Sequence, residues 1–184
     1  MGQYHTIVAD PPWHYDRTGV TFHDGSSGEF KGHGLPYPTM SLDDIAALPV
    51  ADLAARDAHL YCWTTQKYLE HTYDIVRGWG FSPSCLLVWC KPIRGWTVGG
   101  TFMSTTEFVL FARRGSLKAL TRCDRQWFEW PRGAHSAKPE AFMDIVEQVS
   151  PGPRVELFSR RARLGWDVWG NEVGSTVDLA AAES

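Results

Sequence analysis

Short apolar runs alternate with longer polar or amphipathic segments along the chain. The first run, residues 4–8, contains Tyr4, Ile7 and Val8 and indicates a buried strand. Similar runs predict further strands at residues 59–63, 84–89, 106–112, 126–130, 154–158 and 164–169. The run at 84–89 is apolar on both faces, which is typical of a central strand.

Three segments between these runs have helical patterns. Ser41 is a candidate N-cap, with acidic residues in the following turn, for a short helix that ends near Leu48. Thr64 or Thr65 begins a longer helix that ends near Gly78. A third helix starts at Pro139 and has an apolar stripe: Phe142, Ile145, Val146 and Val149. Alternating strands and helices predict an α/β sheet covered on both faces.

The remaining segments are irregular. Residues 14–38 contain five glycines and few large apolar residues, so we expect a long functional loop that is mobile in the free protein. The histidines His14, His23 and His33 in it match no standard zinc spacing, so no metal site is expected. Residues 92–104 form a second loop. We assign residues 1–173 to one domain and 174–184 to a flexible tail.

Composition narrows the class of protein. A hydrophobic content of 43% over 184 residues is enough for one domain with a full core. No apolar run approaches the ~20 residues that span a bilayer. The chain enters its first strand directly, so no signal peptide is expected. The four cysteines include no C-x-x-C pair, and we expect reduced thiols and a cytoplasmic location.

Charge is unevenly distributed. Residues 91–163 carry thirteen Lys or Arg against seven Asp or Glu, whereas both flanking regions are acidic. A basic middle fits a localised site for a polyanion, although an ordinary mixed surface would also account for it. The candidate nucleic-acid-binding residues in this region are Arg94, Arg113, Lys118, Arg122 and Arg125.

The segment Asp10-Pro11-Pro12-Trp13 directly follows the first strand. Open α/β sheets bind ligands beyond the carboxyl ends of their strands, and two prolines make this exit stiff. The Asp10 carboxylate and the Pro11 carbonyl are both acceptors that could bind the exocyclic amine of a nucleobase. Trp13 could stack on that base. The alternative is a rigid turn with a solvated Asp and a packed Trp.

Two common nucleotide-binding patterns are absent. The sequence contains neither G-x-G-x-x-G nor G-x-x-x-x-G-K-[ST], which disfavours a nicotinamide dehydrogenase or a P-loop enzyme.

Several further segments occur in an order that resembles one family. They are Leu-Pro-Tyr-Pro-Thr-Met-Ser (35–41), Leu-Tyr-Cys-Trp-Thr-Thr (60–65), Trp-Gly-Phe (79–81), Val-Trp-Cys-Lys (88–91), His-Ser-Ala-Lys-Pro-Glu (135–140), Ser-Pro-Gly-Pro-Arg-Val-Glu-Leu-Phe-Ser-Arg (150–160) and Trp-Gly-Asn-Glu (169–172). Together with Ala-Asp-Pro-Pro-Trp (9–13), they resemble the adenine N(6)-methyltransferases of the MT-A-seventy type over residues 4–173.

The resemblance implies a Rossmann-like, S-adenosylmethionine-dependent methyltransferase fold in permuted order, with the catalytic motif before the main cofactor segment. It implies that Asp10, Pro11, Pro12 and Trp13 are catalytic. The residues it implies for cofactor binding are Asp10, Lys138, Glu156, Phe158, Arg160, Asn171 and Glu172. Without the resemblance, Glu156 reads as a buried acid paired with an arginine and Phe158 as a core residue.

The chain also departs from some relatives. Where they have a His-Asn pair after the arginine, it has Ala162-Arg163, and where they have a lysine before Glu107, it has Thr106. Some relatives have an additional segment before the first strand that helps to hold the cofactor, whereas the sequence here begins at that strand.

We therefore expect methyl transfer from S-adenosylmethionine to the 6-amino group of adenine in nucleic acid, without a metal. DNA is favoured, because compact single-domain members of the family resemble phage or bacterial DNA methylases, and RNA is the alternative substrate. A catalytically silent nucleic-acid-binding subunit and a small-molecule methyltransferase are the rival functions. The expected partner is nucleic acid and not a membrane, and a homodimer or a heterodimer stays open.

Overall fold

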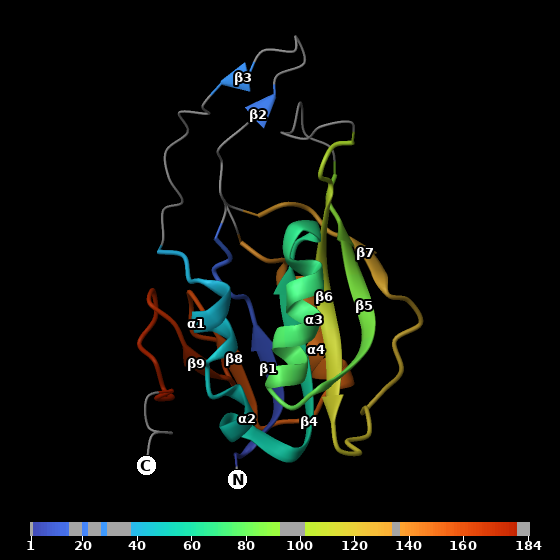
Figure 1. Cartoon of the computed structure of the whole chain (residues 1–184). Helices are drawn as coiled ribbons and strands as arrows, with labels where there is room; N and C mark the ends of the chain where they lie inside the picture. The colour runs from blue at the N-terminus through green and yellow to red at the C-terminus, as the bar shows by residue number, and fades with distance from the viewer. Residues whose placement is uncertain are drawn as a thin grey trace.

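A mixed seven-stranded sheet is the centre of the computed structural model, which describes residues 2–14, 20–21, 27–28, 38–92, 102–133 and 137–179 (Figure 1). Its strands lie in the spatial order β7 (Trp127–Glu129), β5 (Ser82–Cys90), β6 (Thr106–Arg114), β4 (Ala54–Thr64), β1 (Tyr4–Ala9), β8 (Arg154–Leu157) and β9 (Asp167–Trp169).

Strand direction determines which loops meet. β1 is parallel to β4 and β8, and β8 is parallel to β9. β6 is antiparallel to both of its neighbours, β4 and β5, so β5 runs in the same direction as β4. The carboxyl ends of β1, β4, β5, β8 and β9 therefore meet the beginning of β6 at one edge, which we call the carboxyl edge.

Helices cover both faces of the sheet, as the sequence predicts (Figure 1). One face carries α1 (Leu42–Ala46), α2 (Val50–Leu53) and α3 (Leu69–Gly78), which follows the 3₁₀ turn η1 (Gln66–Tyr68). The other face carries α4 (Glu140–Val149). Alternate residues of β1 face the two layers: Ile7 belongs to the core cluster of Ile45 and Val76, and Val8 to that of Phe142 and Val146.

The capping residues in the sequence predicted where two helices begin. Ser41 is the N-cap of α1, and its Oγ accepts a hydrogen bond from the Asp44 N–H at 3.1 Å. Pro139 is the N-cap residue of α4, directly before its first turn. The sequence missed α2, whose four residues are too short to show a period. Because α2 leads directly into β4, that strand begins at Ala54 instead of at residue 59.

The prediction that residues 84–89 form a central strand is wrong. β5 lies second from the edge of the sheet, and its outer neighbour β7 has only three residues. Most of its side chains are accordingly only half-buried, and Trp89 alone is fully buried. An apolar run thus identified the strand correctly but not its position.

The expected loop 14–38 and the expected tail 174–184 each contain some described backbone pairing. Within residues 14–38, β2 (Val20–Thr21) and β3 (Ser27–Gly28) form a short antiparallel ladder, while most of the segment, like most of 92–104, lies outside the described residues. In the tail, Thr176 N–H donates to Val168 O at 2.8 Å, and Leu179 is buried against the core. Over the described ranges, no helix is long and apolar enough to cross a membrane.

Candidate active site

The Asp10–Trp13 turn lies at the carboxyl edge, directly after β1. Backbone hydrogen bonds fix it on both sides: Trp13 N–H donates to Pro11 O at 2.9 Å, and Met40 N–H donates to Pro12 O at 3.0 Å. The Asp10 side chain remains partly exposed at the edge of the sheet. The turn therefore presents one carboxylate and one proline carbonyl in a fixed relation, as the sequence predicts.

Trp13 packs into the core. Only 4% of it is exposed, and its Nε1–H donates to Trp63 O at 3.1 Å. Its ring lies parallel to Tyr68, with a centroid distance of 5.3 Å. In this arrangement the ring has no open face for a nucleobase, which corrects the expectation of base stacking. The contacts give Trp13 an anchoring role for the turn.

Asp10 begins a chain of four alternating charges across the carboxyl edge. Lys138 Nζ lies 2.9 Å from Asp10 Oδ2 and 3.5 Å from Glu107 Oε2. Lys91 Nζ donates to the other carboxylate oxygen of Glu107. The two lysines also lie over indole rings: Nζ of Lys138 is 5.1 Å from the ring centre of Trp63, and Nζ of Lys91 is 4.9 Å from that of Trp89.

The pairing keeps Lys138 and Glu107, which are both partly buried, charged. Burial alone would lower the pKa of Lys138, but the carboxylates of Asp10 and Glu107 outweigh it and the pKa is raised. Burial alone would raise the pKa of Glu107, but Lys138 and Lys91 outweigh it and the pKa is lowered. Because each charge holds its neighbours, the chain fixes the direction of the Asp10 carboxylate.

A second group of candidates lies in the turns after β8 and β9. Glu156 is half-buried, and this burial is the main reason that its pKa is raised. Its carboxylate accepts a hydrogen bond from Ser159 Oγ at 2.8 Å. Phe158 has a φ of 64°, a left-handed conformation that is rare for a large side chain. Its ring contacts Trp169 edge-to-face at 5.2 Å. Phe158 packs against the core as a partly buried side chain, and the charge of Arg161 acts on the Glu156 carboxylate and lowers its pKa, although burial outweighs this effect.

The turns after β8 and β9 touch through their backbones. Ser159 N–H donates to Trp169 O at 2.9 Å, and a Cβ on Gly170 would lie 2.0 Å from Ser159 O. Glycine is therefore required at position 170. Asn171 and Glu172 follow it on the surface, where Glu172 Oε1 lies 3.6 Å from Nε of the exposed Arg160. The structure thus brings the predicted cofactor residues of β8 and β9 to the same edge as Asp10 and Lys138.

A pocket of about 680 Å³ adjoins the charge chain at Glu107. Its described lining comes from the exit of β4, the exit of β5 and the start of β6: Thr65, Gln66, Lys67, Lys91, Ser104, Thr106 and Glu107. The sequence analysis gave Glu107 no role. Glu107 is the single acid in the predicted strand at 106–112, and one acid among apolar neighbours was the signal that could have identified it.

The candidate nucleic-acid-binding residues do not gather around Asp10. Arg113 is at the far end of β6, where it pairs in register with His59 and Ser82, opposite the carboxyl edge. Lys118, Arg122 and Arg125 lie in the connector from β6 to β7. In that connector, Leu120 N–H donates to Val149 O at the end of α4. Arg94 lies outside the described residues.

All four cysteines are free thiols. Among the described ranges, no three His, Cys, Asp or Glu side chains gather in a way that could hold a metal ion.

Comparison with known proteins identifies the family. The family model MT-A70 matches residues 4–172. The chain is 32% identical to the Type II methyltransferase M.MunI of Mycoplasma sp, over 93% of this chain and 78% of the relative. It is 29% identical to the N(6)-adenosine-methyltransferase MT-A70-like protein of Drosophila melanogaster, over 94% of this chain and 27% of the relative. It is 25% identical to the human N(6)-adenosine-methyltransferase catalytic subunit METTL3, over 94% of this chain and 29% of the relative. The chain therefore belongs to the MT-A70 family of S-adenosylmethionine-dependent adenine N(6)-methyltransferases.

Proposed function

We propose that this chain transfers the methyl group of S-adenosylmethionine to the 6-amino group of adenine in nucleic acid, with DNA as the favoured substrate. The observation that carries the proposal is the stiff turn at the exit of β1, where the Asp10 carboxylate is held by Lys138 beside the Pro11 carbonyl.

The turn suits an exocyclic amine. The lone pair of such an amine is delocalised into the base, so the nitrogen is a poor nucleophile. Hydrogen bonds from its two protons to Asp10 and Pro11 favour a pyramidal nitrogen whose lone pair is free. Pro11 O already accepts from Trp13 N–H, but a carbonyl oxygen has a second lone pair. Catalysis then comes from orientation and from fixed acceptors rather than from a covalent intermediate.

The residues after β8 and β9 fit the cofactor, which supplies an activated methyl group on a sulfonium. A half-buried carboxylate, Glu156, can accept hydrogen bonds from ribose hydroxyls. Phe158 and Trp169 form an aromatic pair for the adenine ring, and Asn171 and Glu172 carry polar groups on the same turn. Lys138 and Arg160 are cations on this side of the sheet that can bind the methionine carboxylate in addition to their present partners. We propose no metal, because the partner of Asp10 is the ammonium of Lys138.

The pocket beside Glu107 is the proposed entrance for the target base. It adjoins the Glu107–Lys138–Asp10 chain, and Gln66 at its rim carries an amide, which can form paired hydrogen bonds with an adenine edge. Lys67 on the same rim is placed for a phosphate of the flipped nucleotide.

DNA is favoured over RNA because of the identity to the relatives. The chain is 32% identical to the bacterial Type II methyltransferase, against 29% and 25% for the fly and human N(6)-adenosine methyltransferases.

Methyl transfer from labelled S-adenosylmethionine to DNA, RNA and free adenosine tests the proposal. Nucleoside digestion followed by mass spectrometry should find N(6)-methyladenine in DNA, and Asp10→Asn should remove it. Product on RNA alone would support the RNA reading, and product on adenosine alone a small-molecule methyltransferase. Binding of nucleic acid without any product would indicate a catalytically silent subunit. Size-exclusion chromatography would then test whether the chain forms a complex with a catalytic partner. A chelator should leave the rate unchanged.

A further inference from the structure

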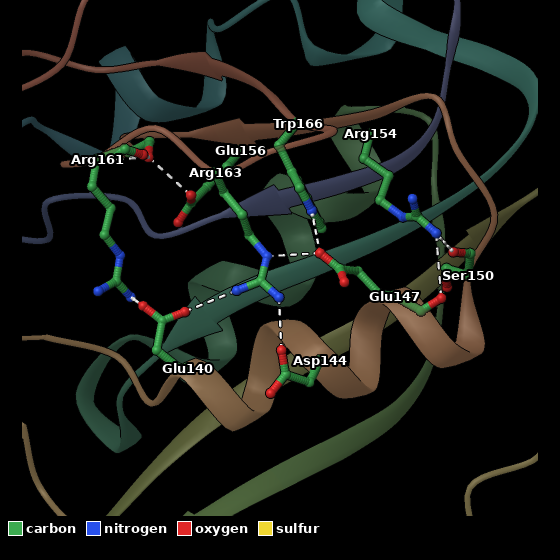
Figure 2. A network of polar contacts seen from close by, with 10 residues as sticks. Glu140, Asp144, Glu147, Ser150, Arg154, Glu156, Arg161, Arg163 and Trp166 are labelled. Carbon is green, nitrogen blue, oxygen red and sulfur yellow. Dashed lines mark hydrogen bonds and ion pairs between the residues drawn. The ribbon is translucent and has the colours of Figure 1, made fainter.

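Arg163 takes part in a polar network that the proposed reaction does not use. Its guanidinium reaches three carboxylates on α4: Nε donates to Glu147 Oε1 at 2.7 Å, Nη1 to Glu140 Oε2 at 2.9 Å, and Nη2 to Asp144 Oδ1 at 2.7 Å (Figure 2). Residues 140, 144 and 147 form one stripe along the helix, with the spacing of residues that share a face. One side chain thus spans two turns of α4.

Two neighbours complete the network. Trp166, which is buried, donates its Nε1–H to the same oxygen of Glu147 at 2.7 Å, and Arg161 pairs with the other oxygen of Glu140 (Figure 2). The side chain of Arg163 is 23% exposed, against 58% for Arg161. The Glu147 carboxylate, together with Asp144, raises the pKa of Arg163. A partly buried guanidinium group that makes several hydrogen bonds fixes the positions of its partners better than an exposed group in a single ion pair does.

The network joins the two halves of the proposed site. Arg163 and Trp166 belong to the turn between β8 and β9, which also contains Phe158. Glu140 begins α4 two residues after Lys138, which holds Asp10. The backbone at Phe158 is in the left-handed region, and such strain persists only where the surroundings over-determine it. Contacts that fix the β8–β9 turn supply that constraint.

We propose that Arg163 is a positioning residue. By tying the β8–β9 turn to α4, it sets the distance between the cofactor residues Glu156 and Phe158 and the Asp10–Lys138 pair. This inference rests on the proposed function, and it assigns a role to the position where some relatives have an asparagine instead. Arg163 itself faces α4 and does not bind the cofactor.

Calorimetric titration of S-adenosylhomocysteine, an analogue that needs no nucleic acid, tests the proposal. Arg163→Gln should raise its dissociation constant by about tenfold or more, since small misplacements of binding groups have effects of that size or larger. Arg163→Lys keeps the charge but loses the forked set of N–H donors. Its dissociation constant should lie between those of Arg163→Gln and the wild type. Arg161→Ala removes one charge from the same turn but only an exposed pair, and should stay within about twofold.

A second measurement separates positioning from folding. A variant that merely unfolds lowers the concentration of active protein, so the apparent kcat falls while the dissociation constant of the folded fraction is unchanged. If Arg163 positions the turn, the KM for S-adenosylmethionine rises and kcat at saturation changes little. If Arg163→Gln does not fold, Glu147→Gln weakens the contacts to both Arg163 and Trp166, because it keeps an acceptor oxygen but loses the charge. It should raise the same constant by a smaller factor.

Hydrogen exchange distinguishes failure of this inference from failure of the proposed function. Without any ligand, Arg163→Gln should speed amide exchange over residues 158–166 and leave β4 unchanged. Wild-type protein that does not bind the analogue would contradict the cofactor assignment, while the exchange result would still test the tie to α4. Unchanged exchange together with an unchanged dissociation constant in Arg163→Gln would overturn the role of Arg163.

Discussion

Single residues at the carboxyl edge owe their roles to contacts that are distant in the sequence. The position of Asp10 after an apolar run was predictable, and so was its stiff proline turn. Its partner Lys138 lies far along the chain, and Glu107 comes from an antiparallel strand. No local pattern contains such a contact, because the sheet order decides it. Trp13 shows the opposite case: its type suggested stacking on a base, but the fold uses it as an anchor.

The first prediction concerns Asp10. Asp10→Asn keeps the size of the side chain but removes the charge that Lys138 holds, and it adds an N–H donor that would face the amine's own protons. Turnover should fall by roughly two orders of magnitude or more, as when one fixed hydrogen bond of a transition state is lost. Single-turnover methyl transfer measures this. Asp74→Asn, which removes an exposed carboxylate paired with Arg77, should retain the wild-type rate. A folded Asp10→Asn protein with normal turnover would contradict the mechanism.

The second prediction concerns the pH dependence at Glu156. Burial raises the pKa of this carboxyl in the folded protein above its unfolded value. The folded state therefore binds the proton more tightly, and ionisation of Glu156 costs stability as pH rises through the folded pKa. Glu156→Gln keeps an acceptor for Ser159 but never ionises. Its melting temperature should exceed that of wild type at pH 8, and the difference should shrink toward pH 4.5. Weaker binding of S-adenosylhomocysteine should accompany the gain in stability. An equal shift at both pH values would show that the carboxylate is not destabilised.

At the scale of elements, the order of strands and helices followed from the sequence, whereas their lengths and sheet positions did not. Each apolar run predicted as a strand contains a strand in the structure. Such runs have to be buried, and the helices beside them in the sequence provide the cover. The strand β5 was placed wrongly in the centre, since hydrophobicity shows that a strand can be buried but not which strands lie beside it. The four-residue helix α2 left no periodic signal.

The third prediction concerns the contact between the β8 and β9 turns. At Gly170 an added Cβ would overlap Ser159 O and N, which are backbone atoms that cannot rotate away. Gly170→Ala should destabilise the protein by roughly 1–3 kcal/mol, the usual effect of overpacking, and should weaken cofactor binding. Gly78→Ala provides the control, because nothing lies within 4 Å of its added Cβ. Chemical denaturation should place that control within about 1 kcal/mol of wild type or slightly above it. Equal effects of the two substitutions would argue against a required close approach.

At the scale of the whole molecule, the basic residues that are grouped in the sequence are not grouped in the fold. Residues 91–163 are basic as a block, but the fold spreads the block over both ends of the sheet. Arg113 lies at the end away from Asp10. Arg161 and Arg163 bind the acidic stripe of α4 instead of a ligand. Lysines at the carboxyl edge, Lys67 and Lys91, line the pocket beside Glu107 although the acidic first half of the chain contributes one of them.

The last prediction uses this difference. If nucleic acid enters at the carboxyl edge, Lys67 lies near a phosphate and Lys118, in the connector between β6 and β7, does not. Binding of a short DNA strand releases about one condensed counterion for each phosphate that the protein neutralises, so affinity falls with salt along a slope that counts such contacts. Lys67→Ala should therefore weaken binding and reduce that slope by about one, whereas Lys118→Ala, with the same loss of charge, should change neither. Fluorescence anisotropy of a labelled oligonucleotide between 50 and 200 mM salt, roughly the range over which such contacts lose affinity, measures both variants. A reduced slope in Lys118→Ala alone would place the nucleic acid on the connector between β6 and β7. The target base would then have to reach Asp10 from beyond the edge strand β7, and flipping one nucleotide out of a strand does not favour such a path.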